Sequence, residues 1–154
     1  MAKTRRSPAQ PVSVVKPLKN KGYALSLRQP WAALLVHGCK WIEIRRWPTD
    51  FRGRLLIHAA KLLDSRFARW PELPDDVRKT TELRGGIIGS IEITGCVRYR
   101  TIDAFKADRR LHLNEPAWFQ TPAMYGFVMT RPERLPFRPL LGYVKIFEVT
   151  ESLG

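Results

Sequence analysis

LSLRQPWA at residues 25–32 and GCKWIEIRRW at residues 38–47 are the most informative segments of this 154-residue chain. The first begins with alternating apolar and polar residues, which is the pattern of a half-buried strand. Its Pro30 suits the first turn of a helix, and Gly38 favours a helix end. The sequence therefore predicts a strand, a short helix and a second strand between residues 24 and 47.

Side chains of the second predicted strand alternate between two faces, because successive residues of a strand point to opposite sides. Glu43 and Arg45 then share one face with Trp41 and Trp47. A carboxylate, a guanidinium and aromatic rings on one face can hold a base or a phosphate. A structural ion pair between Glu43 and Arg45 explains the same pattern. Lys40, at the turn before the strand, can direct its ammonium to this face.

The rest of the chain predicts further strands with a few short helices. Apolar alternation and β-rich composition predict strands over residues 54–59, 86–100, 124–130 and 142–149. Short helices are expected within residues 62–84 and over residues 102–107, and the proline-rich segment 131–139 is expected to link the last two strands. This order predicts an α+β fold, a small β-barrel of five to six strands with short flanking helices.

The chain is strongly basic, with 27 lysine and arginine residues against 14 acidic residues and a net charge of +13. Such a surface attracts polyanions through counterion release, so nucleic acid is the expected partner, ahead of anionic lipid. Residues 1–22 hold six of the positive charges and no acid, which predicts a disordered basic arm or a solubilising leader. The rest keeps +7, so the domain expected over residues 23–150 is basic in its own right.

Several functional classes have no signature in this sequence. The longest apolar runs are far too short to cross a bilayer, and the basic N-terminus lacks the apolar stretch of a signal peptide. Cys39 and Cys96 lie in no zinc-binding spacing, and phosphate-loop and serine-hydrolase motifs are absent. We expect a cytoplasmic protein with reduced cysteines, no membrane span, no metal and no cofactor.

The two opening segments, followed by Arg52-Gly53 and IHAAK at residues 57–61, closely resemble the ASCH domain. That family's pattern is a strand leading into Arg-Gln-Pro-Trp-Ala, a short helix ending in Gly-x-Lys, and an Ile-Glu-x-Arg strand ending near Trp. YGFVM at residues 125–129 and the proline-rich segment extend the resemblance to roughly residues 24–149. The resemblance implies a PUA-like β-barrel with a cleft beside the first helix, and an activity directed at RNA or its modified bases.

The side chains expected to bind nucleic acid in this cleft are cationic, polar or aromatic. They are Arg28, Gln29, Lys40, Arg45, Arg46, Trp47, Arg52 and Lys61. Arginine and glutamine suit phosphate and base-edge contacts, although Arg28 and Gln29 can equally cap neighbouring backbone groups. The resulting interpretation is a nucleic-acid-binding module, with RNA preferred over DNA, that holds a base or a phosphate in a cationic cleft.

A hydrolase is the alternative function. The family that the sequence resembles includes a proposed ribonuclease type and a small amidohydrolase that removes the acyl group from N4-acetylcytidine. In that amidohydrolase the lysine after the turn glycine is catalytic, and Lys40 matches it, whereas Glu43 stands where that subgroup has threonine. Glu43 can act as a general base for water while Lys40 stabilises an oxyanion. Lys40 and Glu43 are therefore the candidate catalytic residues, and Glu115 is a further acidic candidate.

Overall fold

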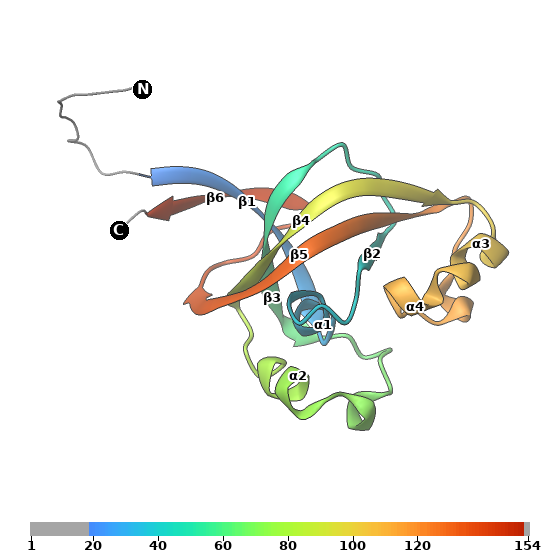
Figure 1. Cartoon of the computed structure of the whole chain (residues 1–154), viewed down its shortest axis with the longest axis horizontal. Coiled ribbons are helices and arrows are strands. Elements are labelled where there is room, and N and C mark those ends of the chain that lie inside the picture. Colours follow the sequence, from blue (N-terminus) through green and yellow to red (C-terminus); the bar gives the residue numbers. More distant parts are fainter. Residues whose placement is uncertain (1–18, 153–154) are drawn as a thin grey trace.

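The computed structural model describes residues 19–152, which form one six-stranded mixed sheet with short helices (Figure 1). The strands are β1 (Lys19–Gln29), β2 (Ile42–Arg45), β3 (Gly53–Leu63), β4 (Gly86–Tyr99), β5 (Met124–Pro139) and β6 (Ile146–Ser152). The helices are α1 (Trp31–Val36), α2 (Asp75–Thr80), α3 (Ile102–Ala107) and α4 (Arg109–His112), with 3-10 turns η2 (Trp70–Glu72) and η3 (Pro116–Trp118).

The strand order in the sheet is β2-β5-β4-β3-β1-β6. β1 and β3 are parallel, and every other neighbouring pair is antiparallel. The chain between the parallel strands contains α1 and β2. This arrangement confirms the α+β class with short helices, whereas the edge strands β2 and β6 share no backbone ladder within residues 19–152, so the sheet is not closed into a barrel by backbone pairing.

The core lies where α1 packs against the sheet. All six residues of α1 are buried, because the helix contacts β1, β3, β4 and β5 on one side and α2 on another. Leu55 and Ile57 of β3 belong to this cluster, whereas Leu56 points to the opposite face and joins a smaller cluster with Val149. The alternation of β3 therefore covers both faces of the sheet with apolar side chains.

The proline-rich segment 131–139 continues β5 and is not the link that the sequence predicted. β2 pairs with β5 only over residues 125–128, so the later part of β5 has a free edge on that side. Proline is tolerated on such an edge because its missing N–H interrupts no ladder there. The link between the last strands is instead residues 140–145, and β6 begins at Ile146 rather than Gly142.

At its N-terminal end the described chain also differs from the expected boundaries. β1 begins at Lys19 and pairs with β6 from that residue on, so residues 19–22 belong to a strand and not to a basic arm. Residues 1–18 lie outside the described residues. The stretch after α3 contains α4 and η3.

Candidate functional site

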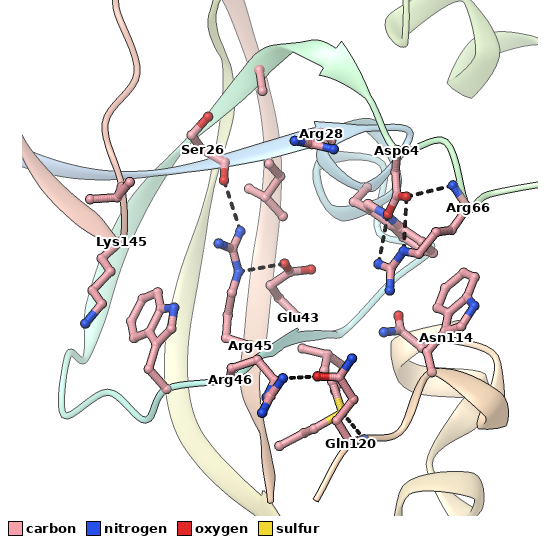
Figure 2. Close-up of a pocket in the computed structure, with 18 of the residues that line it drawn as sticks. Ser26, Arg28, Glu43, Arg45, Arg46, Asp64, Arg66, Asn114, Gln120 and Lys145 are labelled. Atoms are coloured by element: carbon pink, nitrogen blue, oxygen red, sulfur yellow. Dashed lines mark hydrogen bonds and ion pairs between the residues drawn. The ribbon is translucent and has the colours of Figure 1, made fainter.

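A cleft of about 710 Å³ lies between the end of β1, β2, the end of β3 and the segments that follow α4 and β5 (Figure 2). Five cationic side chains and two carboxylates line it, together with four tryptophan or tyrosine rings. The lining residues are Ser26, Leu27, Arg28, Trp31, Glu43, Ile44, Arg45, Arg46, Trp47, Ala60, Asp64, Arg66, Asn114, Trp118, Gln120, Met124, Tyr143, Val144 and Lys145. The cleft is therefore both cationic and aromatic.

Strand β2 places Glu43 and Arg45 on the cleft wall, together with Ile44 between them. The Arg45 Nε donates a hydrogen bond to Oε2 of Glu43 at 3.0 Å, and its Nη2 donates to the carbonyl oxygen of Ser26 at 3.0 Å. Glu43 and Arg45 therefore form an ion pair with each other and also line the cleft. Trp47 also lines the cleft, whereas Trp41 is exposed and lies outside the lining set.

Lys40 lies behind the cleft wall rather than in the cleft. Its side chain is almost fully buried, with the residue 2% exposed, and its Nζ is 3.6 Å from Oε1 of Glu43. The ammonium also donates to the carbonyl oxygen of His112 and sits 4.7 Å from the ring centroid of Trp31. Burial lowers the pKa of Lys40 to about 8, against the opposing attraction of Glu43.

Asp64 fixes the wall opposite Glu43. Its Oδ2 accepts from Nε1 of Trp31 at 2.7 Å, and Arg66 donates to both carboxylate oxygens and from its backbone N–H. Burial raises the pKa of Asp64, but the hydrogen bonds from Arg66 and Trp31 together outweigh it and lower the pKa to about 2. The Arg66 guanidinium also lies 4.3 Å from the ring centroid of Trp118. A charged network therefore joins α1, the end of β3 and η3.

The segment 140–145 forms the rim with Tyr143, Val144 and Lys145. His58 anchors it, because His58 Nε2 donates to the carbonyl oxygen of Leu140 at 2.7 Å while its Nδ1 lies 2.9 Å from the Ser26 hydroxyl. Gly142 passes so close to His58 that an added Cβ would lie 2.6 Å from the ring. The histidine thus positions the rim.

The ASCH domain family model matches residues 25–137. This chain belongs to the ASCH family, within the PUA-like superfamily. It is 25% identical over 146 residues to human activating signal cointegrator 1, a match that covers 86% of the chain and 23% of that protein. The mouse protein of the same name is 58% identical over 38 residues, covering 25% of the chain and 6% of that protein. The chain therefore spans less than a quarter of the length of these curated relatives.

Among solved structures, the ASCH protein of Zymomonas mobilis superposes with a TM-score of 0.57 at 16% identity, covering 77% of this chain and 73% of that one. A Tyr-to-Phe variant of that protein gives a TM-score of 0.56 at 17% identity, covering 79% and 77%. At this level of identity the likeness supports the ASCH fold alone.

Of the nucleic-acid-binding residues expected from the sequence, four line the cleft of this ASCH domain: Arg28, Arg45, Arg46 and Trp47. Arg28 is exposed and has no hydrogen bond or ion pair with the described residues. Arg46 donates to the side-chain oxygen of Gln120. The Trp47 ring meets Phe127 edge to face at a centroid distance of 5.0 Å, so one end of the ring is fixed by the core.

Besides Lys40, three of the expected binding residues lie outside the cleft. Gln29 is fully buried, where its Nε2 donates to the carbonyl of Leu83 at 3.0 Å and its Oε1 accepts from the N–H of Ala33 at 2.9 Å. It holds α1 against the loop after α2 and is not a base contact. Arg52 is exposed and turned back onto nearby carbonyls. Lys61 follows the cleft residue Ala60 on β3, so strand alternation points it away.

Sequence reasoning missed the cleft residues that come from loops. Asp64, Arg66, Asn114, Trp118 and Lys145 carry no local motif, and packing between distant segments brings them together. The acidic candidate next to Asn114, Glu115, does not line the cleft and instead pairs with Arg109 at 2.6 Å.

Within residues 19–152, no group of three or more His, Cys, Asp or Glu side chains could hold a metal ion. No helix in the same range is long and apolar enough to cross a membrane.

Proposed function

We propose that this ASCH domain binds nucleic acid, with RNA preferred over DNA, and that a base or a phosphate group occupies the cleft. The observation that carries the proposal is the gathering of five cationic side chains and four aromatic rings around one cleft of about 710 Å³. Pockets of this order take ligands the size of a nucleotide. Combined positive charge and ring surface is the usual chemistry of single-strand recognition.

Phosphate contacts are the role of the exposed cations at the rim. Arg28 has no partner among the described residues, and Lys145 is exposed on the facing segment. A guanidinium presents a planar fork of donors that matches phosphate oxygens, and Lys145 adds a point charge. The net charge of +13 supplies the longer-range attraction to a polyanion.

Base contacts are the role of the rings deeper in the cleft. Trp47 and Trp118 are half-buried, and both line the cleft. Bases of single-stranded RNA can be splayed out to stack on such rings, whereas bases within a duplex are already stacked. The proposal therefore favours single-stranded RNA over duplex RNA.

Titration of the purified protein with labelled single- and double-stranded RNA and DNA of equal length tests this function. We expect single-stranded RNA to bind most tightly, with an affinity that falls as salt rises because phosphate contacts release counterions. Absence of saturable binding to all four ligands would contradict the proposal.

Hydrolysis is the second candidate function, and one observation favours it. The Glu43 carboxylate faces the cleft with the Lys40 ammonium 3.6 Å behind it. Glu43 would take a proton from a water that attacks a cleft-bound substrate. Because Lys40 is 2% exposed and lines no part of the cleft, its role in this reaction is to hold Glu43, not to contact the reacting atoms.

Assays with N4-acetylcytidine and with labelled RNA test the second candidate. If either is a substrate, Glu43→Gln lowers kcat by at least about a hundredfold, because an amide cannot accept the proton. Equal activity of wild type and Glu43→Gln, or no turnover of either substrate while RNA binding persists, removes the hydrolase.

A further inference from the structure

Asn114 is a buried polar residue whose side chain has no partner. It is 7% exposed and lines the cleft, and its amide makes no hydrogen bond with the described residues. Figure 2 shows the amide pointing into the cleft, toward the side on which Glu43 lies. Buried amides in folded proteins nearly always have a hydrogen-bond partner, so an unpaired one facing a cleft indicates that a ligand supplies it.

The backbone of Asn114 is held in place before any ligand binds. Its N–H donates to Nδ1 of His112 at 2.9 Å, and His112 Nε2 donates to the carbonyl oxygen of Phe105 at 2.7 Å, which sets the tautomer of the ring. The His112 ring stacks on Phe105 at 4.2 Å. Leu113, between His112 and Asn114 in the sequence, adopts a left-handed conformation with φ of 61°. These contacts fix the direction in which the Asn114 side chain leaves the chain.

Lys40 links Asn114 to Glu43 through the same cluster. Its ammonium donates to the His112 carbonyl and lies 3.6 Å from Oε1 of Glu43. The lysine that matches the family's catalytic position is therefore a positioning residue here, joining two walls of the cleft from behind.

Three of the buried polar side chains within residues 19–152 line the cleft, Glu43, Asp64 and Asn114, and of these Glu43 and Asn114 have bonding capacity left. Each oxygen of Asp64 already accepts two hydrogen bonds, so that carboxylate is saturated. Glu43 accepts one close bond, from Arg45, and a carboxylate has about four acceptor sites. A donor group of a ligand, such as an amino N–H, can therefore fill the free acceptor sites of Glu43, while the Asn114 amide offers an NH2 donor group and a carbonyl acceptor.

Adenine and cytosine carry this combination on one edge, an exocyclic amino group beside an unprotonated ring nitrogen. Uracil and hypoxanthine place a carbonyl oxygen where the amino group would be, which sets an acceptor against the Glu43 carboxylate. We propose that Asn114 reads the base in this cleft, and that the cleft prefers bases with this amino edge over their oxo counterparts. This inference rests on the proposed nucleic-acid binding.

Two matched ligand pairs test it on the full chain: short cytidine against uridine oligomers, and adenosine against inosine oligomers of equal length. Within each pair the charge is the same and the ring size unchanged. A good pair of base-edge hydrogen bonds discriminates by roughly tenfold or more, so we expect the amino form to bind that much tighter in at least one pair. Asn114→Leu, which keeps the volume and removes the polar atoms, should bring that ratio close to one.

A ligand lacking the ring nitrogen separates base reading from a merely structural role. Replacing cytosine by 3-deazacytosine, or adenine by 1-deazaadenine, should weaken binding to the wild type and leave binding to Asn114→Leu unchanged. Equal wild-type affinity for both members of each pair, or an unchanged ratio in Asn114→Leu, overturns the base-reading role while RNA binding stands. Absence of binding to every oligomer would instead be a failure of the proposed function itself.

Discussion

Arg45 on β2 donates a hydrogen bond from Nη2 to the carbonyl oxygen of Ser26 on β1 at 3.0 Å. In the sheet these strands are separated by β5, β4 and β3, so a side chain joins strands that share no backbone pairing. The same guanidinium donates from Nε to Glu43 at 3.0 Å. Arg45 therefore holds two walls of the cleft together, in addition to any contact with a ligand.

Arg45→Ala should lower the stability of the fold as well as ligand affinity. Loss of two hydrogen bonds from a charged donor is expected to reduce the free energy of unfolding by about 2 kcal/mol or more. Urea unfolding measures this change. Arg28→Ala is the matched control, because Arg28 is exposed and unpaired among the described residues, and it should change stability by less than about 0.5 kcal/mol. Equal stability of the two variants would contradict the bridging role.

Asp64→Asn should remove a contribution to the free energy of unfolding that the wild type loses only in acid. The folded-state pKa of Asp64 is lowered from 3.8 to about 2, so its contribution is present above pH 3.8 and is lost as pH falls through about 2. The shift corresponds to about 2 kcal/mol at neutral pH. Unfolding of wild type and Asp64→Asn should therefore differ most at pH 5 to 7 and converge toward pH 2. A difference that does not depend on pH would show that the carboxylate charge is not the cause.

Lys40→Met should change how stability depends on alkaline pH. Burial lowers the folded-state pKa of Lys40 from 10.5 to about 8, so the unfolded chain binds the proton more tightly. The cost of burying the ammonium is fully present below about pH 8 and is relieved as pH rises toward 10.5. Wild type should gain up to about 3 kcal/mol relative to Lys40→Met across that window, measured by denaturant unfolding. A stability difference between wild type and Lys40→Met that does not change with pH would show that the Lys40 ammonium is solvated in the folded protein.

Local sequence patterns predicted the β2 wall of the cleft and little of the opposite wall. Strand alternation placed Glu43 and Arg45 at the cleft, as found, because it depends only on neighbouring residues. It was wrong for Trp41, which lies outside the lining, and for Ile44, which also lines the cleft. Of the two roles predicted for Gln29, backbone capping is confirmed by its bond from the N–H of Ala33, whereas its other partners, the carbonyls of Thr80 and Leu83, lie more than 50 residues away and carried no local signal. Asn114 had no signal, since its direction depends on the contact of its backbone with the buried His112 ring.

The extent of β5 was missed for a related reason. Three prolines in residues 131–139 indicate a break when the segment is considered alone. Whether such a segment can be a strand depends on which of its edges is paired, and that follows from the short length of β2. The topology of the whole sheet therefore decided a local structure that composition could not.

Binding of labelled single-stranded RNA to two double variants with the same charge tests the central claim most directly. One variant is Arg28→Ala with Arg46→Ala, both exposed in the cleft, and the other is Arg84→Ala with Arg100→Ala, both exposed and outside its lining. Fluorescence anisotropy at about 0.15 M ionic strength keeps distant charges screened. We predict that the cleft variant loses at least about tenfold in affinity while the control loses less than about threefold. Equal losses in the two variants would mean that the basic surface as a whole, and not this cleft, binds RNA.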